Sequence, residues 1–473
     1  MAATETEFDL SIIGAGPGGY TAAIRAAQLG MKVACIEKEG QLGGTCLRVG
    51  CIPSKTLLEA TAQFALVRER LAPSGITCDK VQMDLAALLA RKDHIVATLS
   101  HGVAGLFRKN RIERINATAS FVSANELQIA AAGGRRLIRA ARVLIATGSA
   151  PIELPNMPFD ARRVISSDQA IALGAVPKRM VVIGAGAIGL ELSSVWKRLG
   201  ADVTVLEIYH STLPGADEEM GRLMERTLKG QGLKFHFGVQ ATGLREEKGH
   251  LTVRFASRQT GLEKNESALT ADVVLVAVGR RAYAQGLDLD KAGVATDERG
   301  RIVVNRAWQT SVPNIYAIGD VIAGPMLAHK AQEEGIAVAE LMAGKAGHVN
   351  YDAIPLVVYT SPELAWVGKT EEQLKAAGVQ YNVGKFRFAA NARALCMDET
   401  QGMVKILADG HSDRILGVHI LGPQASSLIA QAGMAMELGA SSEDIARTCH
   451  AHPSLPEALR EAALAVEGRA INA

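Results

Sequence analysis

The sequence has few aromatic residues, few cysteines, no long apolar run and almost no net charge. Phe, Trp and Tyr make up 4% of the 473 residues, so the cores that a 48% hydrophobic content can build must be aliphatic. Six cysteines in a chain of this length are too sparse for a secreted disulfide framework. No apolar run reaches the length of a membrane-spanning helix, so we expect no membrane segment.

Charge and the first residues narrow the class of protein further. The chain carries 51 basic and 49 acidic residues, a net charge of +2, which gives no electrostatic reason to expect nucleic acid as a partner. Residues 1–8 are acidic and resemble neither a secretory signal nor a transit peptide. We therefore expect a cytoplasmic protein of two to four domains, in which a disulfide would be catalytic rather than structural.

Two cysteines lie close together among glycines, with Gly43 and Gly44 before Cys46 and Gly50 before Cys51. The other four cysteines form no second pair, which disfavours a zinc site. In an ideal helix the Cα atoms of residues i and i+5, the spacing of Cys46 and Cys51, lie roughly 8–9 Å apart. A disulfide spans about 4.4–6.8 Å, so the glycines would have to fold the backbone more tightly. Two unrelated core cysteines are the simpler alternative, but the segment indicates a redox thiol pair beside a cofactor.

The residues after Cys51 predict a helix, with Pro53 in its first turn. A thiol at a helix N-terminus has a lowered pKa because it meets the positive end of the helix dipole. Lys55 adds a nearby cation, so Cys51 is the predicted stable thiolate. Cys46, in the predicted loop before the helix, is the predicted partner for an outside thiol or disulfide.

One structural unit occurs twice in the chain, at a constant offset. In the first copy an apolar strand runs into a glycine turn, a helix and a second strand that ends in an acid. This is the fingerprint of a dinucleotide-binding βαβ unit, in which the helix N-terminus meets a pyrophosphate and the acid binds a ribose. One glycine turn alone could be structural, but two complete units predict two bound dinucleotides. The predicted binding residues are Gly14, Gly16, Gly19 and Glu37 in the first copy and Gly184, Gly186, Gly189 and Glu207 in the second.

The end of the second copy indicates which nicotinamide cofactor binds. An acid such as Glu207 accepts the ribose hydroxyls of NAD and repels the 2′-phosphate of NADP, which usually meets arginine. The next residues, 208–210, include no arginine. The sequence therefore favours NAD.

Three apolar strands end in glycine, as buried parallel strands do beside a ligand. They lie within residues 143–149, 273–280 and 315–320. Asp320, at the end of the third strand, is predicted to reach a cofactor; the alternative is a local turn or cap.

Breaks in the pattern suggest the domain organisation. Pro151, Pro155 and Pro158 follow the first nucleotide unit, and a second break lies between Gly344 and Asp352. The fold class predicted from these patterns is α/β, with two Rossmann-like dinucleotide-binding domains plus a C-terminal α+β domain. The predicted segments are 1–150, 151–280, 281–349 and 350–473.

The loop near the C-terminus contains the best candidate for a proton acceptor. Pro453 and Pro456 stiffen a loop in which His452 and Glu457 can converge. A carboxylate that accepts from one imidazole nitrogen fixes the tautomer and leaves the other nitrogen as a base. His450 is the competing candidate.

Together these motifs resemble the dihydrolipoamide dehydrogenases, one branch of the disulfide-reducing flavoproteins (the pyridine nucleotide-disulfide oxidoreductase family), which also include glutathione and mercuric reductases. The resemblance extends from Phe8 to Glu457 and rests on the segment 43–55, both βαβ units, Asp320 and the loop 450–457. Glutathione reductases would have arginines after the second unit, and mercuric reductases a C-terminal cysteine pair. This sequence has neither.

The resemblance implies that segments 1–150 and 281–349 bind FAD, that 151–280 binds NAD, and that 350–473 forms a homodimer interface. Cys51 would lie against the flavin and Lys55 near it, with Glu191 near the nicotinamide. Other residues expected to bind a cofactor are Lys38, Gly44, Thr45, Ala117, Thr147, Gly148, Ser149, Ile188, Val239, Gly279, Asp320, Met326, Leu327, Ala328 and His329.

The implied reaction is the oxidation of protein-bound dihydrolipoamide, with FAD passing hydride to NAD. His452, held by Glu457, would take a thiol proton, and a thiolate would attack the Cys46–Cys51 disulfide and form a mixed disulfide at Cys46. In the family this histidine serves the disulfide of the partner subunit. The expected partner is the lipoyl domain of a 2-oxo acid dehydrogenase acyltransferase or of a glycine-cleavage carrier protein. No lipoyl segment precedes Phe8, so we expect that domain on a separate chain.

The sequence departs from the family pattern in three places. Arg48 stands where Asn is usual, Pro456 where Ser is usual, and Ala117 and Ala119 where glycines are usual near the flavin. Arg48 could tune the thiolate or the docking of a partner. A related FAD-dependent reductase for another disulfide or for an electrophile is therefore the alternative function, and a non-catalytic binding subunit is a third, which the complete set of catalytic residues argues against.

Overall fold

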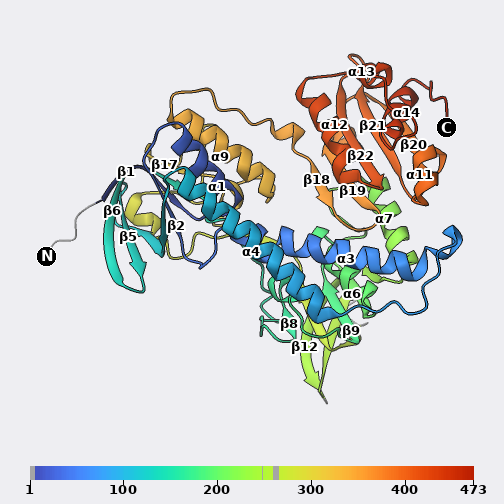
Figure 1. Cartoon of the computed structure of the whole chain (residues 1–473), viewed down its shortest axis with the longest axis horizontal. Coiled ribbons are helices and arrows are strands. Elements are labelled where there is room, and N and C mark those ends of the chain that lie inside the picture. Colours follow the sequence, from blue (N-terminus) through green and yellow to red (C-terminus); the bar gives the residue numbers. More distant parts are fainter. Residues whose placement is uncertain (1–5, 248, 259–265, 473) are drawn as a thin grey trace. The chain divides into compact units, whose positions relative to one another are not determined.

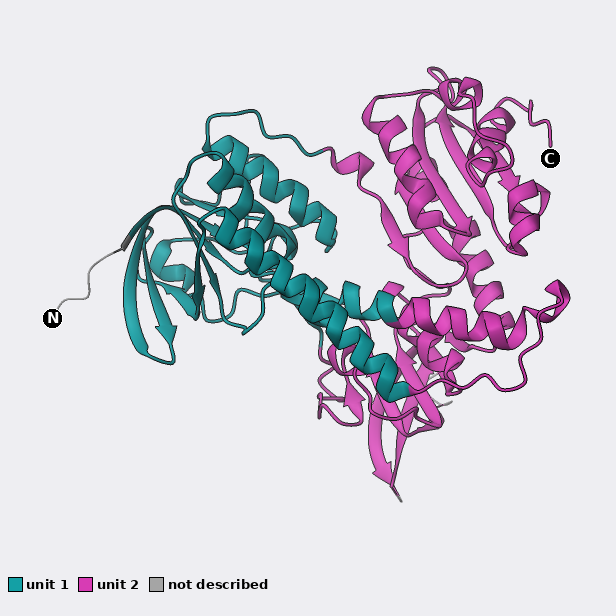
Figure 2. Cartoon of the chain, in the orientation of Figure 1, with its two compact units in different colours: residues 1–56, 85–152, 279–349 teal, residues 57–84, 153–278, 350–473 magenta. Residues whose placement is uncertain are grey.

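The computed structural model describes residues 6–247, 249–258 and 266–472. They form two compact units, each made from three separate stretches of chain (Figure 2). Unit 1 contains the residues up to 56 together with 85–152 and 279–349, and unit 2 contains the remaining stretches. None of the described helices combines the length and the apolar character that a membrane span requires.

Unit 1 is built on a mixed sheet with the strand order β3-β2-β1-β6-β5-β4, in which β17 also pairs with β6 (Figure 1). The pairs β1–β2, β2–β3, β1–β6 and β6–β17 are parallel, whereas β4–β5 and β5–β6 are antiparallel. The strands are β1 Thr6–Ile13, β2 Val33–Glu37, β3 Glu113–Asn116, β4 Thr118–Phe121, β5 Glu126–Ala131, β6 Gly134–Ile145 and β17 Ile315–Ala317. A short separate ladder joins β7 Ser149–Pro151 to β16 Arg280–Ala282.

Two helices of unit 1 that are far apart in the sequence, α1 (Pro17–Gln28) and α9 (Ala328–Met342), pack closely side by side (Figure 1). A Cβ atom on Gly335 would lie 2.6 Å from Gly18 O, so only glycine allows this approach. Arg25 and Glu340 form an ion pair at 2.6 Å between the same helices. The other helices of the unit are α2 Gly44–Val49, α4 Leu85–Lys109, α8 Leu289–Ala292 and the 3₁₀ turn η2 Gly319–Val321, and α3 Cys51–Glu69 begins here and continues into the residues of unit 2.

The first half of unit 2 repeats the nucleotide-binding architecture. Its five-stranded sheet has the order β11-β10-β9-β15-β8, and all pairs are parallel. The strands are β8 Val164–Ile165, β9 Arg179–Ile183, β10 Asp202–Glu207, β11 Lys234–Phe237 and β15 Val273–Val276, and the helices are α5 Ser167–Ala170, α6 Ala187–Arg198 and α7 Glu218–Gly230. An antiparallel ladder of β12 Val239–Glu247, β13 His250–Ser257 and β14 Ser267–Ala271 accompanies this sheet.

The second half of unit 2 is an antiparallel sheet with helices packed on it. The strand order is β18-β19-β22-β21-β20, and the central strands are buried at nearly every position, because α12 and α14 contact the sheet. The strands are β18 Leu356–Val358, β19 Glu363–Gly368, β20 Tyr381–Arg387, β21 Met403–Asp409 and β22 Ile415–Gly422. The helices are α10 Glu371–Ala376, α11 Ala392–Met397, α12 Ala425–Glu437, α13 Ser442–Arg447 and α14 Glu457–Ala465, with 3₁₀ turns η3 Tyr351–Ala353 and η4 Phe388–Ala390. A further 3₁₀ turn, η1 Ala72–Ser74, follows α3 in the stretch 57–84 of unit 2.

The predicted fold class is confirmed: a mixed sheet and a parallel sheet, each with a Rossmann-like βαβ unit, precede a C-terminal α+β domain. The predicted break at Pro151 falls at the end of β7. The exact segment boundaries stay predictions.

A buried ionic cluster joins the two halves of unit 2. Lys405, on β21, is fully buried, and its Nζ donates to Asp217 Oδ2 at 2.8 Å and to Glu371 Oε2 at 2.6 Å. Asp217 also caps α7 by accepting from Glu219 N. Burial alone would lower the pKa of Lys405, but its hydrogen bonds to the two carboxylates raise that pKa above its ordinary value. Although burial raises the pKa of Glu371, its bonds with Lys375 and Lys405 bring the pKa down to about 2.

Replacing Lys405 should destabilise unit 2, because Asp217 would remain buried without its counter-ion. We expect Lys405→Met to lower the free energy of unfolding by about 3–5 kcal/mol, as for other broken buried pairs. The measurement is urea unfolding followed by circular dichroism. Lys234→Met is the matched control, since Lys234 pairs with Asp202 at 2.8 Å on an exposed surface. It should lower stability by less than about 1 kcal/mol. Equal losses in the two variants would contradict a stabilising role for burial of the cluster.

Candidate functional site

At the first glycine turn, the backbone before α1 packs closely against the residues that follow β6. Gly14 has a φ of +103°, in the left-handed region that favours glycine. A Cβ atom on Gly14 would lie 2.5 Å from Ala146 O, and one on Gly19 would overlap Gly14 O. The turn is therefore open to close approach by a ligand and closed to larger residues at these two positions.

The surroundings of this turn fit a dinucleotide. Glu37, buried at the end of β2, accepts from Ala15 N at 2.8 Å, so its carboxylate faces the glycine turn. Gly16 is the N-cap residue of α1 and supplies no side-chain acceptor, so the helix N-terminus is suited to a pyrophosphate. Ala117 N donates to Glu37 O at 3.0 Å, which places this predicted residue beside the acid.

The second copy reproduces this geometry. Gly184 has a φ of +107°, and a Cβ atom there would lie 2.5 Å from Ala277 O. Buried Glu207 accepts from Ala185 N at 2.5 Å. Gly186 caps α6 without a side chain, as Gly16 caps α1. The second turn therefore fits a second dinucleotide for the same physical reasons as the first.

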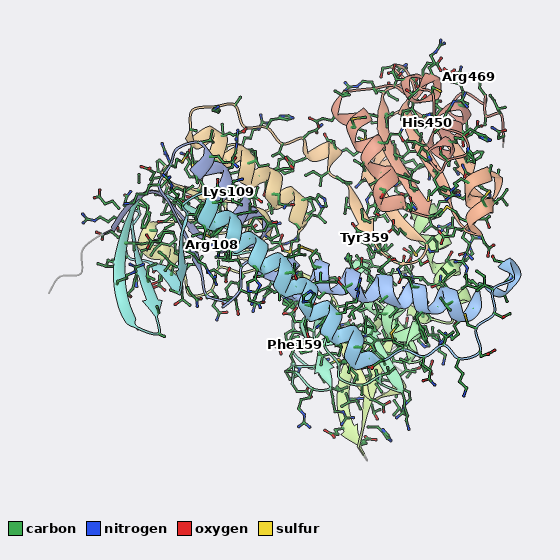
Figure 3. All side chains as sticks on the ribbon, in the orientation of Figure 1. Arg108, Lys109, Phe159, Tyr359, His450 and Arg469 are labelled. Carbon is green, nitrogen blue, oxygen red and sulfur yellow. A yellow bond between two sulfur atoms is a disulfide. The ribbon has the colours of Figure 1, made fainter. Side chains whose placement is uncertain are left out.

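Glu191 lies one turn after the start of α6 and is buried. Its Oε1 accepts from Tyr359 N at 2.9 Å, a residue that follows β18 and is labelled in Figure 3. Burial raises the pKa of Tyr359, and the nearby carboxylates of Glu363 and Glu191 add to the effect. The predicted position of Glu191 near the nicotinamide stays a prediction.

Cys46 and Cys51 form a disulfide, with Cα atoms 4.6 Å apart. Cys46 lies on α2 and Cys51 begins α3, so the two helices meet at Gly50. A Cβ atom on Gly50 would lie 2.9 Å from Thr45 O, which explains the need for glycine at the break. The expectation that one regular helix cannot contain the bridge is confirmed. The expectation that Cys46 lies in a loop is wrong, because the turn at Gly43 starts a short helix before it.

The helix that carries Cys46 starts on the first glycine turn. Gly43 N donates to Ala15 O at 2.9 Å, and a Cβ atom on Gly44 would overlap the Cα atom of Gly16. Gly43 and Gly44 have φ values of +113° and +60°. The disulfide is thus built on the same backbone that forms the dinucleotide cradle.

Arg48, the unusual residue between the cysteines, ties α2 to the segment after β2. Its Nη1 donates to Glu39 Oε2 at 3.0 Å. Its Nε is buried and has no hydrogen-bond partner among the residues that the structure describes. Sequence reasoning identified Arg48 but missed Glu39, because no local pattern marks a pair formed across a turn. Lys55 lies on α3 and is partly buried.

Asp320 lies on η2 and is linked to the β7–β16 ladder through Ser149. Ser149 Oγ donates to Asp320 Oδ2 at 2.6 Å, and Arg280 Nε donates to Ser149 Oγ at 2.7 Å. Behind it, fully buried Lys330 and Glu334 pair at 3.0 Å, and Glu334 Oε2 accepts from Gly319 N at 2.7 Å. The sequence analysis missed this pair, although its i,i+4 spacing on α9 is a recognisable signal.

Other predicted residues of unit 1 gather near Tyr283. Thr147 Oγ1 donates to Tyr283 O at 2.5 Å, and Lys38 Nζ donates to Tyr283 OH at 3.0 Å. Gly148 O accepts from Tyr283 N at 2.9 Å. The structure therefore brings together, through Tyr283, predicted residues that follow β2 and β6. Sequence reasoning did not identify Tyr283.

The remaining predicted residues stand at the ends of elements. Thr45 lies in α2, Leu327 is the N-cap of α9, and Met326 precedes it. Residues Ala328 and His329 begin α9, Ile188 lies in the first turn of α6, Val239 begins β12 and Gly279 precedes β16. Gly279 was assigned to the second nucleotide unit and falls among the residues of unit 1. Its role stays a prediction, like those of the other seven residues.

His452 and Glu457 converge as predicted. His452 Nδ1 lies 2.8 Å from Glu457 Oε1, while the imidazole side chain is 72% exposed. Burial raises the pKa of Glu457, but hydrogen bonds with His452 and with Ser454 N outweigh this effect and lower it overall. This arrangement leaves Nε2 of His452 as the outward-facing nitrogen, available to a thiol.

His450, the competing candidate, has contacts on both ring nitrogens. Its Nε2 lies 2.9 Å from Gln431 Nε2, and its Nδ1 lies 2.8 Å from Thr448 O. Figure 3 labels it beside the helices of the C-terminal sheet. The geometry favours His452 as the base. Across the described ranges, no cluster of three His, Cys, Asp or Glu side chains is arranged to hold a metal ion.

Pro456 fits its place at the start of α14. Its φ is −55°, which a proline ring imposes, and its carbonyl accepts from Leu459 N at 3.0 Å. Proline is favoured at the beginning of a helix because its missing N–H is not needed there. The departure from serine is therefore compatible with the local backbone.

Comparison with known proteins covers almost the whole chain. Residues 8–335 match the family described as pyridine nucleotide-disulphide oxidoreductase, and residues 354–463 match the dimerisation domain of the same family. The chain is 49% identical to dihydrolipoyl dehydrogenase 1, mitochondrial, of Arabidopsis thaliana over 98% of this chain and 92% of that protein. It is 48% identical to the human dihydrolipoyl dehydrogenase, mitochondrial, over the same shares.

Other relatives carry different names. The leghemoglobin reductase of Vigna unguiculata is 49% identical over 98% of this chain and 88% of its own length. Among solved structures, LpdA from Mycobacterium tuberculosis has a TM-score of 0.89 at 25% identity, covering 97% of this chain and 99% of its own. The HOCl-induced flavoprotein disulfide reductase RclA of Escherichia coli has a TM-score of 0.84 at 27% identity, covering 96% of this chain and 98% of its own.

The two glycine turns should be separable by substitution. We expect Gly14→Ala to lower the amount of flavin dinucleotide bound per chain, because the added Cβ meets a carbonyl oxygen. For the same reason we expect Gly184→Ala to raise the KM for the nicotinamide dinucleotide. Flavin absorbance per chain and steady-state kinetics measure the two effects. Gly30→Ala is the control, since Gly30 has a similar φ of +91° but open space around it. Loss of the same cofactor in both turn variants would contradict the assignment.

Proposed function

The chain belongs to the pyridine nucleotide-disulphide oxidoreductase family, and we propose that it oxidises protein-bound dihydrolipoamide to lipoamide and reduces NAD. Its cofactors are FAD and NAD, and its dimerisation domain makes it a homodimer. The observation that carries the proposed substrate is the joint presence of the Cys46–Cys51 disulfide and the His452–Glu457 pair in a chain about half identical to dihydrolipoyl dehydrogenases.

The proposed cofactor sites follow the two glycine turns. The first turn, with Glu37, would hold the FAD, and the second, with Glu207, would hold the NAD. FAD, when bound, supplies the exchange of electrons between a dithiol and a nicotinamide. Glu207 supports NAD over NADP, because a carboxylate repels a 2′-phosphate.

The proposed thiol chemistry runs between the histidine and the cysteines. His452 Nε2 accepts a proton from one thiol of the dihydrolipoyl group, and Glu457 stabilises the resulting imidazolium through Nδ1. The substrate thiolate attacks Cys46 Sγ, the Cys46–Cys51 bond breaks, and Cys51 leaves as a thiolate. The second substrate thiol attacks the substrate sulfur of the mixed disulfide, and its proton passes to Cys46 Sγ as Cys46 leaves as a thiol. This step releases cyclic oxidised lipoamide and leaves Cys46 reduced.

The proposed partner is a lipoyl domain on another chain, from a 2-oxo acid dehydrogenase acyltransferase or from a glycine-cleavage carrier protein. The whole-length similarity to dihydrolipoyl dehydrogenases supports it. We further propose that His452 acts on the disulfide of the other subunit of the homodimer. The cytoplasmic location stays a proposal from the sequence, and several relatives are named as mitochondrial.

A substrate comparison tests the function. The purified dimer should reduce NAD with dihydrolipoamide, and should do so faster than it reduces NADP. Faster turnover of NADPH with glutathione disulfide would refute the proposal. An alternative, reduction of another acceptor, is suggested by relatives named leghemoglobin reductase and would be supported if NADH with ferric leghemoglobin gave the faster turnover.

The division of labour between the cysteines has its own test. We expect Cys46→Ser to abolish oxidation of dihydrolipoamide while FAD stays bound and NADH still reduces an artificial acceptor such as ferricyanide. Cys78→Ser is the control, because Cys78 is exposed and free of any disulfide. Release of flavin from the Cys46 variant would mean that Cys46 supports the cofactor rather than the exchange.

A further inference from the structure

His452 depends on its neighbours for orientation. Its side chain is 72% exposed, so packing restrains the ring little, and its contact with Glu457 fixes Nδ1. The other oxygen of Glu457 accepts from Ser454 N at 2.7 Å. The position of the carboxylate, and hence of the imidazole, therefore depends on where the backbone at Ser454 is held.

Side chains from two helices of unit 2 lie around this loop. A cavity of about 400 Å³ lies against it in unit 2. Its walls come from α11, from α12 with the residue before it, and from the loop itself, namely Arg393, Met397, Gln424, Ser427, Leu428, Gln431 and residues 453–456. A hydrogen bond is directional, so one from a neighbouring helix can fix the position of the loop backbone.

One buried side chain makes such a bond. Asn391, 2% exposed, donates from Nδ2 to Ser454 O at 3.0 Å. Its Oδ1 accepts from Ala394 N at 2.9 Å and caps α11. Both the oxygen and the nitrogen of the amide are hydrogen-bonded, so the side chain has one orientation. Helix α11 therefore acts as a fixed support for the loop.

We propose that Asn391 is a positioning residue for the base of the proposed reaction. The chain of contacts runs from Asn391 to the backbone of Ser454, from there to Glu457, and from Glu457 to His452. Gln431, which meets His450, holds the preceding part of the same loop from α12. The inference rests on the proposed function for its catalytic consequence, but its structural content can be measured without turnover.

Two variants separate the bond to the loop from the cap of α11. Serine is a good N-cap residue but is too short to reach Ser454 O, so Asn391→Ser keeps the cap and removes the tether. Asn391→Asp keeps the size and the capping oxygen but places an acceptor against Ser454 O. Each should lower kcat/KM for dihydrolipoamide by about tenfold or more, because small misplacements of a reacting group are costly. NADH oxidation by ferricyanide, which does not use His452, should stay unchanged.

A control and a second measurement distinguish positioning from general damage. Thr370→Ala removes a comparable cap, that of α10, and should leave the dihydrolipoamide and ferricyanide activities at their wild-type values. Hydrogen–deuterium exchange should rise in peptides that cover residues 450–457 in the Asn391 variants and should stay unchanged elsewhere in unit 2. Exchange that stays at the wild-type level in this loop would overturn the inference, whatever the substrate of the enzyme.

The kinetic outcomes are equally distinct. Equal losses of the dihydrolipoamide and ferricyanide activities would show that Asn391 serves stability alone and would refute the positioning role. Full dihydrolipoamide turnover in both variants would refute it as well. If the wild-type dimer oxidised no dihydrolipoamide, the proposed function would fail, while the exchange experiment would still decide whether Asn391 holds the loop.

Discussion

The hydrogen bond from Gly43 N to Ala15 O is the contact on which the functional part of unit 1 depends. It joins the glycine turn of the nucleotide fold to the start of the helix that carries Cys46. Glu37 binds the other side of the same turn through Ala15 N, so one peptide segment serves both the acid and the cysteine helix. Because both bonds use the backbone of Ala15, where the neighbouring glycines leave little room for side chains, the redox pair and the cradle cannot be displaced independently.

The second copy has the same anchor without the redox cysteines. Leu213 N donates to Ala185 O at 3.0 Å, as Gly43 N does to Ala15 O, and Leu213 also has a positive φ, +53°. In the second copy the chain then continues towards α7 without any cysteine. The same turn thus stands without a redox pair in one place and carries the disulfide helix in the other.

Local pattern predicted the two βαβ units, the helix that starts at Cys51 and the meeting of His452 with Glu457, because each depends on residues close in sequence or on a repeated motif. It did not predict contacts between distant segments. Asn391 reaches the loop of His452 from the start of a separate helix. The burial of Lys405 depends on three segments, far apart in the sequence, that meet only in the folded protein. Nor did it place Cys46 on a helix, since six residues carry too weak a periodic signal.

Pro456 has a consequence for the unfolded chain as well as for the folded one. With Pro453 it restricts the backbone on both sides of Ser454 and Leu455 before any tertiary contact forms, since each proline ring fixes φ. Fewer conformations are then lost when the loop orders, so the entropy that opposes placing the imidazole is reduced in advance. Serine in place of Pro456 would leave more of that ordering to be achieved by hydrogen bonds made after folding.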